Sequence, residues 1–260
     1  MTDKQWNWLL RLNDRSRASV RLFGFPGAGA GPSAFTELAR RLPPHVELWG
    51  VALPGREARF SEPPPSELEP LMAQLTESVL PFTNEPYALF GYCSGALLAY
   101  LTAQHLISSG APAPSRLFVA NYPPPHVVNR TARELASCGS DEFWAKIISL
   151  GGVPDNILEL EDLRAVFEPA FRADYRLLAR YEHNARAESR FPLTIVSSDR
   201  DPSAAHNVTG WARYATHTAQ HEQIRSGRWL LSEATEQLGA LLGRLLAGHT
   251  EVTPPAASSR

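Results

Sequence analysis

The feature that most constrains the fold of this chain is the pentapeptide Gly91–Gly95 (GYCSG), which joins a strand-like segment to a helical one. Residues 87–90 (YALF) before it are aromatic and apolar, and the chain after it continues as ALLAY. A sharp turn from strand to helix crowds the backbone, and glycines on both sides of the central residue relieve that crowding. The pattern predicts a nucleophile elbow, in which the Cys93 side chain projects from the top of a sheet at the amino end of a helix.

Two other interpretations of this turn stay open at this point. Free cysteines are often buried for structural reasons, and Ser94 would be the nucleophile if the turn were shifted by one residue. In the elbow interpretation the backbone N–H of Ser94 is a natural donor to an oxyanion, because Ser94 follows the nucleophile. The partial positive charge at the helix start favours the thiolate of Cys93, which is the reactive form.

Segments with the composition of strands alternate along the chain with segments of helical periodicity. The strand-like segments are β-branched or aromatic and are 19–25, 46–53, 87–90, 116–121 and 192–197. Ser66 is placed to cap a helix whose apolar face runs from Leu68 to Val79, and 238–245 repeats that spacing. This alternation predicts an α/β fold with a mostly parallel central sheet, helices on both faces, and a ligand site at the carboxyl ends of the strands.

The block 140–184 interrupts the alternation, because it is longer than a single sheet-covering helix needs to be and is rich in Leu, Phe and Arg. We interpret it as part of a helical lid inserted at about 131–185, with two ordinary packing helices as the alternative. A chain of 260 residues does not require a second domain, so 1–248 is predicted to be a single one. Residues 249–260 are rich in Pro, Ser and Ala and are expected to form a disordered tail.

Composition narrows the classes of function. The formal net charge of -2 argues against a general binder of nucleic acid or anionic membranes. The only two cysteines, Cys93 and Cys138, do not make a disulfide framework, and reduced thiols fit a cytoplasmic protein. We find no signal-peptide pattern and no apolar run long enough to span a membrane. The sequence has no metal-ligand spacing and no nucleotide fingerprint, so we expect the protein itself to bind no metal and no cofactor.

A glycine-rich loop, Phe25–Gly31 (FPGAGAG), follows the first predicted strand. Its backbone N–H groups can converge on a small anionic atom, and we take Ala28 as the second oxyanion donor beside Ser94. A phosphate-binding loop is the alternative for such glycines, but it requires a Gly-Lys-Ser/Thr sequence that is absent here.

Several motifs together resemble those of type II thioesterases, the α/β-hydrolases that serve polyketide and nonribosomal peptide assembly lines. Phe25–Ala30 is similar to their FPHAGG loop, Leu53–Arg59 (LPGREAR) to LPGRExR, and Gly91–Ala96 to the GHSMGA elbow. Further similar segments are Leu117–Val119 with Pro123–His126, Leu150–Pro154 and Arg172–Tyr175. The resemblance covers about 19–245 and implies an α/β-hydrolase fold with a mobile helical lid. It also implies thioester substrates on the phosphopantetheine arm of acyl or peptidyl carrier proteins, in natural-product biosynthesis.

The chain departs from this family at the positions that carry the chemistry. Cys93 replaces the family serine, and Gly27 replaces the histidine of FPHAGG. The family motif GGHFFL corresponds to Ser226–Leu231 (SGRWLL), so Arg228 takes the place of the catalytic histidine. The acid is retained in SSDRDP, which resembles GGDxDP, and we choose Asp201, with Asp199 as the alternative.

A Cys93/Asp201/Arg228 site can capture an acyl group without a histidine. A thiol is partly ionised near neutral pH, the Arg228 guanidinium favours its thiolate, and Asp201 can hold Arg228 in a bidentate pair. Hydrolytic release is harder, because water needs a general base and arginine is not one. We therefore expect slow hydrolysis in competition with acyl transfer to another thiol.

Three alternatives remain. The chain can be an ordinary editing hydrolase with a relocated base, for which His206, His217 and His221 are candidates; His126 we interpret as structural. It can also be a catalytically degenerate module that binds an acylated carrier protein. The third alternative is a small-molecule esterase, which the LPGRExR and lid motifs disfavour. Arg172, Arg176 and Arg180 recur at helical spacing and form a solvated face or a docking site for an acidic carrier protein.

Overall fold

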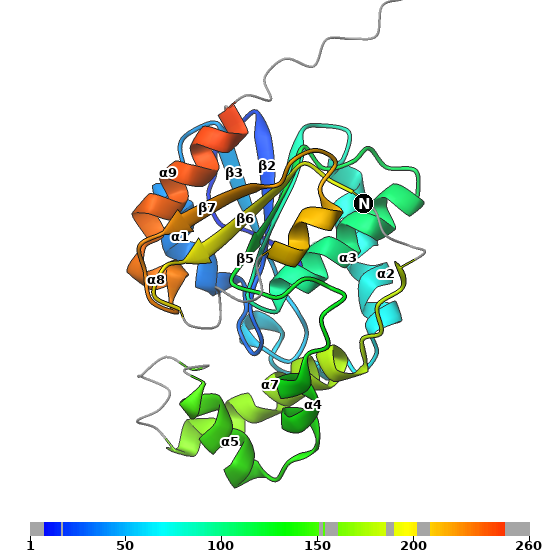
Figure 1. Cartoon of the computed structure of the whole chain (residues 1–260), viewed down its shortest axis with the longest axis vertical. Coiled ribbons are helices and arrows are strands. Elements are labelled where there is room, and N and C mark those ends of the chain that lie inside the picture. The colour runs from blue at the N-terminus through cyan, green and yellow to red at the C-terminus, as the bar shows by residue number, and fades with distance from the viewer. Residues whose placement is uncertain are drawn as a thin grey trace, which may run out of the picture.

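A seven-stranded sheet forms the centre of the computed structural model, which describes residues 8–16, 18–150, 153, 161–185, 190–201 and 209–247 (Figure 1). The strand order is β1-β3-β2-β4-β5-β6-β7. The strands are β1 (Leu9–Arg11), β2 (Val20–Phe25), β3 (Val46–Val51), β4 (Tyr87–Tyr92), β5 (Arg116–Ala120), β6 (Leu193–Ser198) and β7 (Gln220–Ile224). All pairs are parallel except β1 with β3. The predicted α/β-hydrolase architecture with a mostly parallel sheet is therefore confirmed.

The five predicted strands form the middle of the sheet, and both edges were missed by the sequence argument. The central strands are buried on both faces, and most of their residues are therefore apolar. Strand β7 (QHEQI) is polar and largely open to solvent, so it has no apolar pattern to detect. Strand β1 has only three residues, which is too short for a periodicity.

Helices cover the two faces of the sheet (Figure 1). The helices α2 (Leu68–Val79) and α3 (Gly95–Ser108) pack on one face, and α1 (Thr36–Arg41), α8 (Leu230–Glu233) and α9 (Thr235–Leu246) pack on the other. Short 3₁₀ helices are η2 (Pro32–Phe35), η3 (Glu57–Arg59), η4 (Leu80–Phe82) and η6 (Thr209–Tyr214). The predicted cap at Ser66 is wrong: α2 begins after Glu67, and the Ser66 carbonyl instead accepts a hydrogen bond from Arg180.

The segment predicted as a lid contains the helices α4 (Arg130–Ser137), α5 (Ser140–Ser149) and α7 (Glu161–Arg180), which gather below the sheet in Figure 1. They have a small core of their own, formed by Leu135, Phe143, Trp144, Ile147, Val153 and Phe171. Phe171 lies against Gly29, just beyond the carboxyl end of β2, so these helices cover the edge of the sheet where a site is expected. Movement of the lid stays a prediction, and the predicted tail, 249–260, lies outside the described residues.

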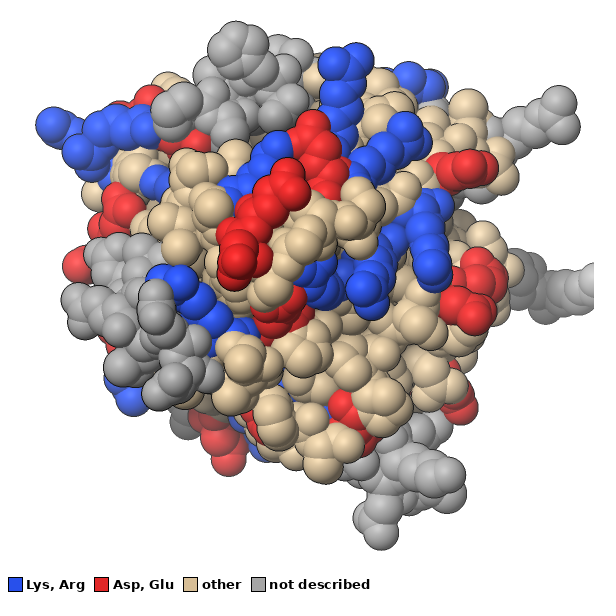
Figure 2. Space-filling model, turned by 90° about the horizontal axis from the view of Figure 1, so that it is seen from below, with Lys and Arg blue, Asp and Glu red and all other residues tan. Residues whose placement is uncertain are grey.

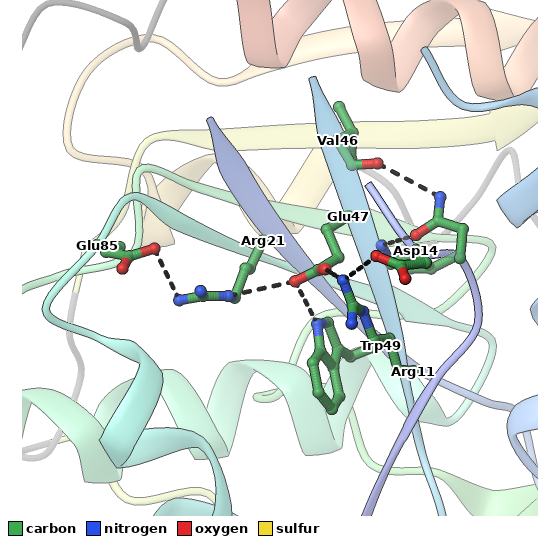
Figure 3. Close-up of polar contacts among 9 residues, drawn as sticks. Arg11, Asp14, Arg21, Val46, Glu47, Trp49 and Glu85 are labelled. Atoms are coloured by element: carbon green, nitrogen blue, oxygen red, sulfur yellow. Dashed lines mark hydrogen bonds and ion pairs between the residues drawn. The ribbon is translucent and has the colours of Figure 1, made fainter. Parts of the chain in front are cut away.

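A buried carboxylate on β3 fastens the antiparallel edge strand (Figure 3). Glu47 accepts hydrogen bonds or ion pairs from Arg11 of β1 at 2.5 Å, from Arg21 of β2 at 3.3 Å and from the indole of Trp49 at 2.8 Å. Arg21 continues to Glu85 at 3.0 Å. The network compensates the cost of burying the Glu47 charge and holds β1, which has few backbone hydrogen bonds of its own. Within the described residues, no helix is both long and apolar enough to cross a membrane.

Candidate active site

Strand β4 ends at Tyr92 and α3 begins at Gly95, so Cys93 lies at the apex of a tight strand–helix turn. Its backbone has a φ of 51°, a strained left-handed conformation for a residue with a side chain. A Cβ at Gly91 would lie 2.3 Å from the Cα of Ala96, and one at Gly95 would lie 2.1 Å from the carbonyl oxygen of Phe25. Both glycines are therefore required by close backbone approach, and the turn has the geometry that the sequence predicts for an elbow.

Ser94 has the backbone geometry of a helix start and not of the turn apex. Its φ of -57° is helical, and its side chain is buried. Its backbone N–H donates a hydrogen bond to the sulfur of Cys93. A frame shifted by one residue, with Ser94 as nucleophile, would require the strained conformation at the wrong position.

The Cys93 thiol is half-buried, and its surroundings do not favour ionisation. Burial raises the pKa of the thiol above its ordinary value, and the charge of Asp201 acts in the same direction. The Ser94 N–H and the charge of Arg228 lower the pKa but do not outweigh burial. The Ser94 N–H at the helix start and Arg228 thus act in the predicted direction, towards the thiolate. Burial outweighs them, and a sequence does not show how far a thiol is desolvated.

The glycine-rich loop after β2 passes directly beside Cys93. A Cβ at Gly27 would lie 3.3 Å from the Cβ of Cys93 and 3.9 Å from its sulfur. The N–H groups of Gly29 and Ala30 are used within the protein, by Asp174 at 2.8 Å and by the Gly27 carbonyl at 3.1 Å. Among the described residues the Ala28 N–H has no such partner, so it stays our candidate for the second oxyanion donor.

The structure distinguishes the two candidate acids. Asp201, which follows β6, is 4% exposed, and its charge acts on Cys93 and on the neighbouring Tyr92. Asp199 instead accepts the N–H of Ser226 at 3.0 Å and so joins the ends of β6 and β7. Asp201 therefore lies in the electrostatic surroundings of the thiol, whereas Asp199 connects two loops.

Arg228 lies between β7 and α8, and its backbone is fixed beside the elbow. The hydroxyl of Tyr92 donates a hydrogen bond to the Arg228 carbonyl at 2.9 Å. The Arg228 charge acts on Cys93 with the opposite sign to that of Asp201. The bidentate pair that we predicted between Asp201 and Arg228 is not formed among the residues described. The two charges instead act on the pKa of the Cys93 thiol in opposite directions, Arg228 lowering it and Asp201 raising it.

The described histidine candidates lie away from Cys93. His217 precedes β7 and therefore lies at the amino edge of the parallel sheet, opposite to the carboxyl edge where Cys93 follows β4. His221 is near the start of the same strand, and its Nε2 contacts the Ser197 hydroxyl at 2.8 Å. His126 contacts the Tyr214 hydroxyl at 2.9 Å, as a structural residue would. His206 lies outside the described residues.

Two adjoining pockets lie between the elbow and the lid. The smaller has an empty volume of about 360 Å³ and is lined by Pro26, Leu53, Leu68, Ser94, Leu97, Leu98, Asp174, Leu177 and Leu178. The larger, of about 670 Å³, begins at Tyr122 and extends past His126 and His183. Leu97 and Leu178 line both. These volumes include open solvent, and the space that the centre of a water molecule can reach is about 10 Å³ in the smaller pocket and about 200 Å³ in the larger. Sequence reasoning missed both pockets, because leucines at helical spacing indicate any packed helix.

The sheet topology, the elbow at its carboxyl edge and the helices above that edge define an α/β-hydrolase. Comparison with known proteins narrows this class. A family model described as a thioesterase domain matches residues 20–247. The chain is 31% identical to the thioesterase PikA5 of Streptomyces venezuelae, over 92% of this chain and 86% of that protein. It is 28% identical to the gramicidin S biosynthesis protein GrsT of Aneurinibacillus migulanus, over 78% of this chain and 80% of that protein.

The solved structures agree with the sequence comparisons. RedJ, a thioesterase from the prodiginine biosynthetic pathway of Streptomyces coelicolor, superposes with a TM-score of 0.82 at 32% identity, over 90% of this chain and 92% of that one. This chain belongs to the thioesterase domain family.

Proposed function

We propose that this protein is a type II thioesterase-like enzyme that accepts acyl or aminoacyl groups from acyl or peptidyl carrier proteins in natural-product biosynthesis. The observation that carries the proposal is Cys93 at the strained apex of the elbow, with the Ser94 N–H directed at its sulfur. Membership of the thioesterase family and similarity to PikA5, GrsT and RedJ support the substrate class. The phosphopantetheine arm belongs to the substrate, and we propose no cofactor bound by the enzyme.

Acylation begins with attack of the Cys93 thiolate on the thioester carbonyl carbon. The new S–C bond forms while the carbonyl oxygen takes the negative charge, which the N–H groups of Ser94 and Ala28 stabilise. The bond from carbon to the pantetheine sulfur then breaks, and the carrier leaves as a thiol after taking up the proton that Cys93 lost. One thioester is exchanged for another, so the step needs no external energy source.

Release follows the same route in reverse with a second carrier thiol, or proceeds with water to give the free acid and the Cys93 thiol. Water requires a general base worth about 10²–10⁴-fold in rate. Arg228 cannot supply it, and His217 and His221 lie away from the thiol. We therefore propose that transfer to a thiol competes with slow hydrolysis.

Arg228 and Asp201 act on the charge of the sulfur. The guanidinium favours the thiolate that attacks, and the carboxylate opposes it. Burial still leaves the pKa of the thiol raised, so the two charges only adjust the small fraction of thiolate, and neither residue needs to transfer a proton. The backbone anchor of Arg228 on Tyr92 keeps the guanidinium near the elbow during the reaction.

Intact-protein mass spectrometry after mixing with acyl-loaded carrier proteins tests the proposal. We expect a mass adduct on the wild type and on Cys138→Ala, which removes the other thiol, and no adduct on Cys93→Ala. The adduct should move to a second, unloaded carrier. Rapid turnover to free acid would instead support an editing hydrolase with a relocated base. An absent adduct and unchanged loaded carriers, with every acyl chain tried, would leave a carrier-binding module.

A further inference from the structure

A buried ion pair joins the lid to the core directly beside the elbow. Arg56, which follows β3, forms a bidentate pair with Asp174 of the lid helix α7, at 2.6 and 2.9 Å. The two side chains are 4% and 10% exposed. Asp174 also lines the small apolar pocket together with Ser94. Buried ion pairs are a weak source of stability, because desolvation offsets their attraction. Stability alone therefore does not explain why Arg56 and Asp174 form a pair beside the elbow.

Asp174 makes a second contact, and it is to the glycine-rich loop. The Oδ2 atom that pairs with Arg56 also accepts the backbone N–H of Gly29 at 2.8 Å. Gly29 has a φ of 72°, and a Cβ there would lie 2.5 Å from the ring of Phe171 on the same lid helix. Arg56 itself donates to the Ala30 carbonyl at 3.4 Å. The lid helix therefore holds the loop on the far side of Ala28 from Cys93.

The next residue of the LPGREAR motif holds the other end of this loop. Glu57 accepts hydrogen bonds from the backbone N–H and the hydroxyl of Ser33, and its side chain fills the space where a Cβ at Gly31 would lie. The loop is thus braced at Gly29, Ala30 and Ser33. Its start at Gly27 lies against Cys93.

We propose that Asp174, oriented by Arg56, is a positioning residue for acylation: it sets the direction of the Ala28 N–H in the oxyanion hole. This inference rests on the proposed function. Ala28 lies between Gly27, which contacts Cys93, and Gly29, whose N–H is fixed by Asp174. Because oxyanion donors act only within about 3 Å of the developing charge, a small rotation of this loop removes their effect. In this proposal, helix α7 of the lid both covers the site and helps to position the oxyanion hole.

Two reactions of the same thiol separate positioning from general damage. Acylation by a loaded carrier builds an oxyanion, whereas alkylation by iodoacetamide displaces iodide and needs no oxyanion hole. The variants are Asp174→Asn, which keeps an acceptor for Gly29, and the double variant Arg56→Met/Asp174→Leu, which removes that acceptor and leaves no unpaired buried charge. Glu168→Gln is the matched control, because Glu168 pairs with Arg172 on the same helix and faces away from the loop.

We expect the single-turnover acylation rate at saturating carrier to fall by about 10- to 100-fold in the double variant, since misplacement by 1 Å can cost 10²-fold. Asp174→Asn should lose less, and Glu168→Gln should match the wild type. Alkylation rates and melting temperatures should stay close to wild type in all three. Equal acylation in the double variant and the wild type would overturn the inference, as would a parallel loss of acylation and alkylation in Asp174→Asn. If no carrier acylates the wild type, the proposed function fails first and the inference with it.

Discussion

The reactivity of Cys93 depends on burial and on three neighbouring groups, Ser94, Arg228 and Asp201, which shift the pKa of its thiol in different directions. Burial raises the pKa of the thiol, and the Ser94 N–H and Arg228 lower it. A serine in the same place would hardly ionise at all, whereas a thiol keeps some thiolate even with a raised pKa. In the proposed mechanism, a cysteine nucleophile therefore depends less than a serine would on a neighbouring histidine.

The rate of Cys93 alkylation by iodoacetamide across a pH series should show how these influences combine to set the thiol pKa. Because the thiol pKa is raised, alkylation of Cys93 should still accelerate as the pH rises through the range of an ordinary thiol. Arg228→Gln should slow alkylation at every pH below the plateau, and Asp201→Asn should speed it, since their charges act with opposite sign. A wild-type plateau already reached at neutral pH would contradict the raised pKa.

Arg228→His tests whether the missing base limits release. An imidazole in this loop would lie beside the elbow, because the Arg228 backbone is fixed by Tyr92. We expect the isolated acyl-enzyme to decay to free acid about tenfold faster or more, since a general base is worth about 10²–10⁴-fold. Mass spectrometry over time measures the decay, with Arg228→Gln as the control. Equal decay in the two variants would mean that activation of water does not limit release.

At the scale of elements, the strand–turn–helix unit 87–108 depends on close approach between backbones. A Cβ at Gly95 would meet the backbone of Phe25 and Pro26, so Gly95→Ala must displace β2 or the elbow. We expect a loss of unfolding free energy of about 2–4 kcal/mol together with lost acylation. Gly139→Ala has nothing within 4 Å of the new Cβ and should change stability little. Urea denaturation compares the two, and equal midpoints would refute the argument.

The edge of the sheet depends on the Glu47 network. Glu47→Ala leaves Arg11 and Arg21 without their shared carboxylate (Figure 3). These arginines are 40% and 26% exposed and so remain partly solvated. We therefore expect a loss of about 1–3 kcal/mol in urea denaturation, below the cost for a fully buried pair. Asp14→Ala removes a partner of Arg11 that is 81% exposed and should cost less than about 1 kcal/mol. A larger effect at Asp14 would contradict this account.

At the scale of the whole molecule, charged side chains of both signs lie on the face where the lid helices are found. Figure 2 shows that face, where basic side chains gather in groups with acidic ones between them. Of the three arginines at helical spacing, Arg172 is used internally, because it pairs with Glu168 and lies over the ring of Phe143. Arg176 and Arg180 are exposed, but Arg180 also donates a hydrogen bond to the Ser66 carbonyl, so Arg176 is the better candidate for the predicted docking role.

If the carrier protein docks on this face, the KM for the carrier should depend on the surface charge and on the salt concentration. Arg176→Glu should raise the KM for an acidic loaded carrier by about tenfold or less and leave kcat unchanged, because an exposed charge steers binding and not chemistry. Rising ionic strength should weaken the difference. Arg40→Glu, on the exposed surface of α1, is the control. An unchanged KM in Arg176→Glu would place docking elsewhere.

The central strands and the elbow were predictable because their signals are local. Each central strand is buried on both faces and is therefore rich in apolar residues, and the elbow needs glycines at fixed spacing. Strands β1 and β7 were missed because neighbouring residues hold them in place. The three-residue β1 is held by the ion pair of Arg11 with Glu47, and the polar edge strand β7 is held by its pairing with β6. The Ser66 cap failed because α2 begins after Glu67, one residue later than that cap requires.

The sequence by itself determined the fold class and the position of Cys93 in the turn, because both follow from residue types at short spacing. Only the tertiary structure decided the ionisation of the thiol, since desolvation depends on everything packed around the sulfur. It also joined three motifs that lie far apart in the chain, through Gly29, Arg56 and Asp174. A buried ion pair forms between chain segments that meet only after folding, so no local pattern could have revealed it.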